Sequence, residues 1–173
     1  MAAARLHVNV ACPDSPSQKT AAAKQAGATR GLEAWLVKIA PASARGELCV
    51  ALVSDRRMRA LNRQFRGKDA VTDVLSFPAQ DRSVSSVPSS ARRPTADRSV
   101  AFLGDIVIAD GVAKRQAKAA GHGIQTEIRV LALHGLLHLM GYDHDGDDGK
   151  MARAEARLRK KAGLPAGLIE RQG

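Results

Sequence analysis

The segment 124–140 constrains the fold of this chain more than any other part of its sequence. Residues 130–140 read Val-Leu-Ala-Leu-His-Gly-Leu-Leu-His-Leu-Met, and a further glycine, Gly141, follows them. The run has the length of a helix, and Gly141 can adopt the left-handed conformation that ends one. Because a helix that is apolar on nearly every side is stable only when it is buried, we predict a helix over 124–140 around which the other elements pack.

Hydrophobic periodicity and the positions of glycine and proline indicate the other elements. Alternation predicts strands at Leu6–Ala11, Glu47–Val53, Val71–Phe77 and Phe102–Ala109. Helices are predicted over Ser17–Ala40 with interruptions at Gly27 and Gly31, over 55–66 with Ser54 or Asp55 as N-cap and Gly67 as C-cap, over 110–120 with Asp110 as N-cap, and over 148–162. Strands and helices without regular alternation are typical of an α+β fold. We expect one domain over 1–173, with a mixed sheet of about four strands, about five helices and a metal site on the central helix.

The stretch Gln80–Val100 is rich in Ser, Pro, Arg and Ala, with almost nothing to bury, and we predict a mobile surface loop there. Cys12 and Cys49 show no CxxC spacing, which favours buried free thiols in a reducing compartment. No apolar run approaches the roughly 18 residues of a membrane span, and residues 1–10 lack the character of an export signal. A cytoplasmic location without a membrane partner is therefore expected.

Two histidines of the apolar run, His134 and His138, are four residues apart, so both imidazoles project from one face of the predicted helix. That spacing lets two ring nitrogens reach one ion, and His144 can supply a third ligand after the turn at Gly141. Three protein ligands leave the fourth position open, as in catalytic zinc sites. The alternative is that the histidines are ordinary core residues. Two buried imidazoles need partners, however, and a third histidine at ligand spacing favours the metal.

The spacing His-x3-His-x5-His matches that of the metzincin proteases, with one difference in the residue after the first histidine. Those proteases carry a glutamate there as general base, and this chain carries Gly135. Peptide hydrolysis by their mechanism is therefore not expected, and water activation must depend on the metal or on a carboxylate from elsewhere. Asp143 is the first candidate for a carboxylate that orients the ligands. Asp105 and Asp73 could act likewise, although each could equally be a turn or strand-end residue.

Arginines recur at three, four and three residues along the predicted helix 55–66, on the side opposite its apolar stripe. A solvated charged face usually mixes signs, and here only Asp55 stands nearby as a counter-charge. The chain holds 27 Lys and Arg against 17 Asp and Glu, a formal net charge of +10, which favours a nucleic-acid partner over a merely solvated face. The candidate RNA-binding residues are Arg56, Arg59, Arg63 and Arg66. The last helix repeats the pattern with Lys150, Arg153, Arg157 and Lys160.

Three segments together resemble the YbeY family, the bacterial endoribonucleases that act in ribosomal RNA maturation. His134–His144 resembles its histidine signature, and Leu61–Asp69 continuing through Thr72–Pro78 resembles its second hallmark. Leu103–Ile108 is similar to the third. The chain departs from the family at Gly123 and Thr126, where Ser and Arg are usual, at Gly149 and Lys150 in place of an acidic pair, and in a longer loop at 80–100.

The resemblance implies an α+β fold and a zinc-dependent hydrolase with one Zn²⁺ per chain on His134, His138 and His144. It also implies a functionally critical arginine at Arg66, which makes Arg66 and the three histidines the candidate catalytic residues. The implied activity is cleavage of single-stranded RNA in 16S rRNA 3′-end maturation and ribosome quality control. The implied partners are ribosomal RNA and the small ribosomal subunit, with ribosomal proteins or an assembly GTPase as candidate protein partners.

Two other functions stay open at the level of sequence. The first is a zinc hydrolase with a non-nucleic substrate, which Gly135 and the basic stripes disfavour. The second is a non-enzymatic ribosome-assembly factor that binds rRNA and in which zinc only stabilises the fold. An open fourth coordination position distinguishes a catalytic zinc from a structural one.

Overall fold

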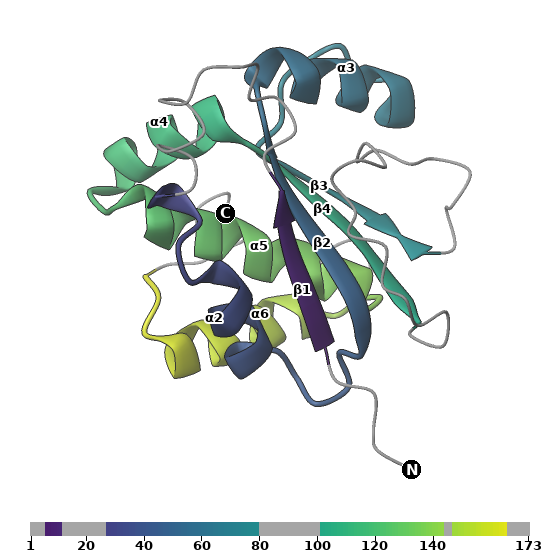
Figure 1. Ribbon diagram of the computed structural model, residues 1–173, viewed down its shortest axis with the longest axis vertical. Helices are drawn as coiled ribbons and strands as arrows, with labels where there is room; N and C mark the ends of the chain where they lie inside the picture. The colour runs from purple at the N-terminus through teal and green to yellow at the C-terminus, as the bar shows by residue number, and fades with distance from the viewer. Residues whose placement is uncertain (1–5, 12–26, 80–100, 144–146, 166–173) are drawn as a thin grey trace.

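Four strands form one mixed sheet in the order β1-β2-β4-β3 (Figure 1). This computed structural model describes residues 6–11, 27–79, 101–143 and 147–165. Strands β1 (Leu6–Ala11), β2 (Gly46–Val53) and β4 (Phe102–Ala109) are parallel, and β3 (Val74–Pro78) pairs antiparallel with β4. The predicted mixed sheet of four strands is confirmed. The predicted loop at 80–100 lies outside the described residues.

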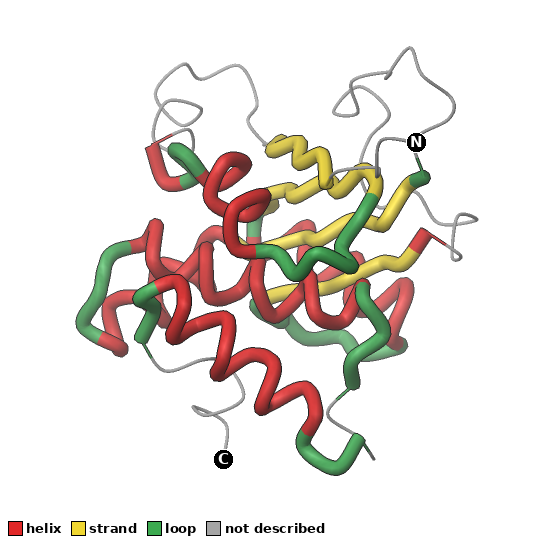
Figure 2. Tube along the Cα trace, turned by 90° about the horizontal axis from the view of Figure 1, so that it is seen from below, coloured by secondary structure: helices red, strands yellow, loops and turns green. Residues whose placement is uncertain are grey.

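Five helices accompany the sheet in the described part of the chain, as predicted for an α+β fold. In Figure 2 the strands form one layer, and more of the helical turns lie to one side of it than to the other. No described helix combines the length and the apolar character needed to cross a membrane. The helices are α2 (Leu32–Ile39), α3 (Asp55–Arg66), α4 (Asp110–Ala120), α5 (Ile124–Leu139) and α6 (Lys150–Ala162).

The two faces of the sheet are covered by different helices, because alternate side chains of a strand point to opposite faces. On β2, Leu48, Val50 and Leu52 pack in one apolar cluster with α2 and α5. Cys49, Ala51 and Val53 lie in a second cluster, with Met58 and Leu61 of α3. The thiol of Cys49 is buried, as predicted, and forms no disulfide within the described part of the chain. Cys12 lies outside the described residues.

Helix α5 is the central helix, as its sequence predicts, and Figure 1 shows it running behind the strands. Leu131 and Leu136 belong to the cluster that includes the sheet. Leu133 and Leu137 belong to a third cluster, with Met151, Ala154 and Leu158 of α6. α5 therefore lies between the sheet and α6, which explains why its residues are apolar on nearly every side.

Gly135 lies where α5 touches the sheet most closely. A Cβ at this position would lie 2.9 Å from Cγ2 of Ile106 and 3.0 Å from Oγ of Ser76. The Ser76 hydroxyl also donates a hydrogen bond to the Gly135 carbonyl, over 3.2 Å. A side chain as long as glutamate has no room here, so the missing protease-type base follows from packing of α5 on β3 and β4.

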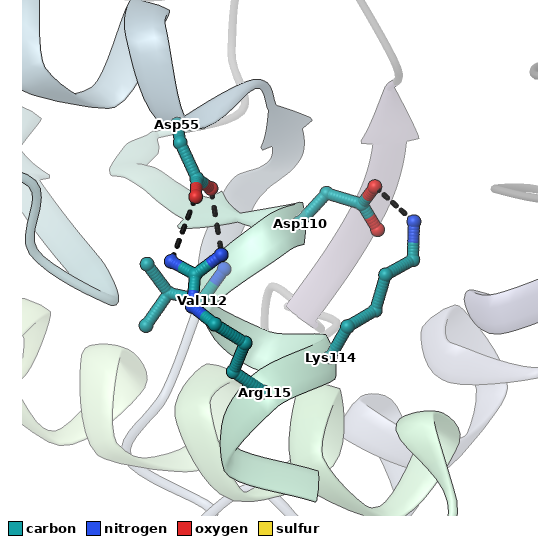
Figure 3. Close-up of polar contacts among 5 residues, drawn as sticks. All are labelled: Asp55, Asp110, Val112, Lys114 and Arg115. Atoms are coloured by element: carbon teal, nitrogen blue, oxygen red, sulfur yellow. Dashed lines mark hydrogen bonds and ion pairs between the residues drawn. The ribbon is translucent and has the colours of Figure 1, made fainter. Parts of the chain in front are cut away.

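The N-terminus of α4 is capped by a residue that sequence reasoning did not select. We expected Asp110 to cap it, but Asp110 is its first residue, and the N-cap Ala109 makes no side-chain cap. Asp55 of α3 serves instead: its Oδ1 accepts from the Val112 amide over 3.2 Å, and its Oδ2 accepts from Nη2 of Arg115 over 2.8 Å (Figure 3). Asp110 instead pairs with Lys114 one turn along the helix.

Two other predicted boundaries move. Strand β3 begins at Val74 rather than at Val71, and Asp73 marks its start by accepting from the Val74 amide over 2.8 Å. Of the helix expected over Ser17–Ala40, residues 27–28 and α2 from Leu32 are helical, and the interruption predicted at Gly31 is confirmed by its left-handed conformation; 17–26 lie outside the described residues. By contrast, Ser54 caps α3 and Gly67 ends it with φ of 66°, as predicted.

Replacement of Gly135 by alanine tests the close approach of α5 to the sheet. We expect Gly135→Ala to lower the free energy of unfolding by about 1–3 kcal/mol, the usual cost of overpacking a core. Gly27→Ala is the matched control, because a Cβ at Gly27 meets no described atom within 4 Å. Denaturant unfolding of both variants measures the difference, and equal stability would show that α5 can shift without cost.

Candidate metal centre

His134 and His138 converge on one point beside α5. Their Nε2 atoms are 3.2 Å apart, and their ring planes meet at 74° with centroids 4.8 Å apart. His134 is buried, with 4% of its surface exposed, whereas His138 is half-buried. The helix therefore presents one sheltered and one more accessible nitrogen at the same place, as the four-residue spacing predicts.

The separation of these nitrogens suits a shared metal ion. Two imidazole nitrogens bound at roughly 2.0–2.1 Å to one tetrahedral ion lie about 3.3–3.4 Å apart. The observed 3.2 Å is close to that value, and neutral imidazole is a preferred zinc ligand. Among the residues that the structure describes, no group of three or more His, Cys, Asp and Glu could hold a metal. The predicted third ligand, His144, lies outside those residues, so the three-histidine site stays a prediction.

Glu155 of α6 reaches the other nitrogen of the His134 ring. Its Oε1 lies 3.4 Å from Nδ1 of His134, and 2% of the residue is exposed. Sequence reasoning did not select Glu155. The sequence does indicate that position 155 is buried, because it is four residues after Met151 and adjoins Ala154 and Leu158 on the apolar stripe of α6. An acidic residue on a buried stripe needs a partner.

Two of the three aspartates considered as ligand-orienting carboxylates, Asp73 and Asp105, occupy other places, while the role of Asp143 stays a prediction. Asp73 accepts from the Val74 amide over 2.8 Å and from Nε2 of Gln116 over 3.0 Å, so it fixes the start of β3. Asp105 alternates along β4 with the residues that face α5, so its side chain lies on the other face of the sheet. Asp143 is exposed, just beyond the end of α5.

The arginine face of α3 carries a counter-charge that the sequence analysis overlooked. Nε and Nη2 of Arg59 donate to the two carboxylate oxygens of Asp69, each over 2.8 Å. This hydrogen bonding lowers the pKa of the Asp69 carboxyl and raises the pKa of Arg59. Of the four candidate arginines, Arg59 is the one with an ion pair in the described part of the chain; all four are exposed: Arg56, Arg59, Arg63 and Arg66.

The arginine face and the histidine pair lie on opposite sides of the sheet. α3 packs on the face of Cys49 and Val107, whereas α5 packs on the face of Val50 and Ile106. Arg66 ends α3, and the chain then leads into β3, the last strand in the sheet order. An RNA strand that contacts both Arg66 and His134 would therefore have to pass around the edge of the sheet formed by β3. The catalytic role expected of Arg66 stays a prediction.

Comparison with known proteins gives matches over most of the chain. A family model described as endoribonuclease YbeY matches residues 15–163. The endoribonuclease YbeY of Solibacter usitatus (strain Ellin6076) is 46% identical over 120 residues, which are 69% of this chain and 69% of that protein. That of Koribacter versatilis (strain Ellin345) is 43% identical over 130 residues, 75% of this chain and 74% of that protein. A solution structure from Thermotoga maritima is 23% identical with a TM-score of 0.49, over 90% of this chain and 88% of that one.

The histidine pair, the second hallmark around β3 and the third hallmark in β4 all fall within the matched residues. Identities above 40% extend over more than two thirds of the chain in both relatives. This chain belongs to the YbeY family of endoribonucleases, and it is a hydrolase.

Proposed function

We propose that the protein is a zinc-dependent endoribonuclease that cleaves single-stranded RNA in ribosomal RNA processing. One zinc ion per chain is bound by His134, His138 and His144, and the reaction serves 16S rRNA 3′-end maturation and ribosome quality control. The observation that carries the proposal is the convergence of two Nε2 atoms, 3.2 Å apart, on the central helix of a YbeY-family chain. The protein works in the cytoplasm, with ribosomal RNA and the small ribosomal subunit as partners.

The residues of the proposed site have two roles: the histidines bind the metal, and Arg66 stabilises charge during the reaction. His134 and His138 hold the metal from one face of α5, and the half-buried position of His138 leaves a side through which substrate can approach. Zinc in this place supplies Lewis acidity toward a phosphoryl oxygen and activates water near neutral pH. The guanidinium of Arg66 stabilises the charge that develops on the phosphoryl group, as arginine forks do.

The exposed arginines of α3 bind the RNA backbone. Arg56, Arg63 and Arg66 offer charge to phosphates, while the fork of Arg59 is occupied by Asp69. A single strand that lies on α3 and crosses the edge at β3 joins this face to the histidine pair on the other side of the sheet. A flexible single strand can follow such a bent path, whereas a duplex is too stiff.

Removal of one histidine tests the metal assignment. We expect about one zinc per chain in the wild-type protein and little in His138→Ala, because losing one of three ligands greatly weakens binding. His7→Ala is the control, since His7 is exposed on β1. Elemental analysis measures the zinc, and an assay on a single-stranded RNA oligonucleotide measures cleavage. Full zinc in His138→Ala would refute the assignment, and full zinc without cleavage by the wild-type protein would favour an assembly factor.

Arg66→Ala tests charge stabilisation in the transition state. Loss of one such donor typically costs about 2.7–4 kcal/mol, a rate loss of about a hundred- to a thousand-fold. We expect that loss in turnover at saturating RNA, with little change in affinity. Arg56→Ala removes an arginine from the first turn of the same exposed face and should affect affinity instead. Normal turnover in Arg66→Ala would make Arg66 a binding residue.

Variants of Arg59 and Asp69 test whether the arginine face binds RNA, because they change the charge of that face in opposite directions. Asp69→Asn removes the carboxylate that occupies the Arg59 fork, so RNA affinity should rise and its salt dependence should steepen. Arg59→Ala leaves Asp69 as a negative charge on the face, so affinity should fall and the salt slope should become shallower. Binding titrations of one RNA oligonucleotide at several salt concentrations measure both. Opposite changes support the face, and no change in either variant would place the RNA elsewhere.

A further inference from the structure

We propose that Glu155 is a positioning residue for the metal centre: its carboxylate fixes the His134 ring so that Nε2 faces the ion. The inference rests on the proposed zinc site and adds a residue of α6 to it. It starts from the contact of 3.4 Å between Oε1 of Glu155 and Nδ1 of His134. Both residues are buried, with 2% and 4% of their surfaces exposed.

The position of Glu155 is unfavourable for packing alone. Its neighbours on the inward side of α6 are Met151, Ala154 and Leu158, which pack on Leu133 and Leu137 of α5. A carboxylate that loses its water there carries a large desolvation cost, and an apolar residue of similar size would fit the same surface better. A carboxylate in such a place is explained when it acts on the buried ring beside it.

The chemistry of a carboxylate determines what that action is. An ionised carboxylate only accepts hydrogen bonds, so shortening this 3.4 Å contact into a hydrogen bond requires the proton of the His134 ring to be on Nδ1. In a neutral imidazole the other nitrogen, Nε2, then presents a lone pair. That lone pair faces the Nε2 atom of His138, 3.2 Å away, where the ion is proposed to bind. Carboxylates commonly hold metal-binding histidines in this way.

The location of α6 ties this contact to the third proposed ligand. Oδ2 of Asp147 accepts from the Met151 amide over 2.7 Å and so fixes the beginning of α6. Position 147 follows His144 by only three residues. In the sequence, the third proposed ligand therefore stands close to the residue that caps α6.

A second pair of histidine and glutamate, in which the glutamate is buried, provides a control. Nε2 of His122 lies 3.1 Å from Oε2 of Glu127, which is fully buried near the beginning of α5. Glu127 lies seven residues before His134, two turns along the helix. Loss of Glu127 removes a buried carboxylate from the same helix and perturbs its contact with His122, without removing an acceptor from the metal centre.

Zinc affinity of three full-length variants tests the proposal. In each measurement a metal-free protein competes with a chromophoric chelator for zinc. The proteins compared are the wild type, Glu155→Leu, Glu155→Gln and Glu127→Leu. We expect Glu155→Leu to bind zinc about ten- to a hundred-fold more weakly, the range found when such supporting partners are removed. Glu155→Gln should lose less, because its amide oxygen can still accept from Nδ1. Glu127→Leu should bind zinc as the wild-type protein does.

Two further measurements separate positioning from stability. Thermal unfolding of the metal-free proteins should show Glu155→Leu at least as stable as the wild type, because leucine suits the apolar interface. Nitrogen-15 NMR of the metal-free wild type should show the His134 proton on Nδ1, and Glu155→Leu should shift it toward Nε2.

The results also distinguish this inference from the proposed function. Wild-type zinc affinity in Glu155→Leu, or an equal loss in Glu127→Leu, would overturn the inference and leave the histidine site intact. Failure of the wild-type protein to bind zinc through His138 would overturn the proposed function itself. If Glu155→Leu does not fold, Glu155→Gln decides: unchanged zinc affinity and an unchanged His134 tautomer would refute the role of Glu155.

Discussion

Helix α5 touches the sheet at two points that leave no room for a side chain, and this contact determines where the chemistry lies. A Cβ at Gly104 would lie 2.5 Å from the Phe77 carbonyl and 2.7 Å from Cδ2 of Leu139, and Gly135 is similarly enclosed. The two contacts fix the rotation of α5 about its axis. With 100° per residue, residues 133 and 137 then face α6, while His134 and His138 fall on the flank between α6 and the sheet.

How far the fold could be predicted depends on how far apart the interacting residues are in the sequence. α5, the cap at Ser54 and the left-handed Gly67 follow from signals within a few residues, and all three are confirmed. Asp55 instead caps a helix 57 residues further on, and local patterns selected Asp110 for that role. The apolar stripe of α6 indicates that Glu155 is buried, but it does not identify the partner, because His134 lies on another helix. Only the folded chain brings these residues together.

The separation of α3 from α5 by the sheet gives binding and chemistry different environments. Basic residues on α3 stand in water, where each contact with a phosphate is weak and sensitive to salt. His134 is buried and His138 is half-buried, so electrostatic interactions with a group bound beside them would be stronger than on the exposed face. Asp69 moderates the exposed face by occupying Arg59. In the proposed function, a chain with a net charge of +10 would attract a polyanion broadly and act on it at one separate place.

Two contacts between histidine and glutamate involve α5, and they lie at different places along the helix. The pair at His122 and Glu127 lies at the turn between α4 and α5, where it can only support the fold. The pair at His134 and Glu155 joins α5 to α6 through the ring that would bind the metal. Since a ligand that binds only the folded state adds its binding free energy to stability, occupation of this site would also hold α6 against α5. A buried carboxylate that weakens the apolar interface in the metal-free chain can therefore be offset when the ion is bound.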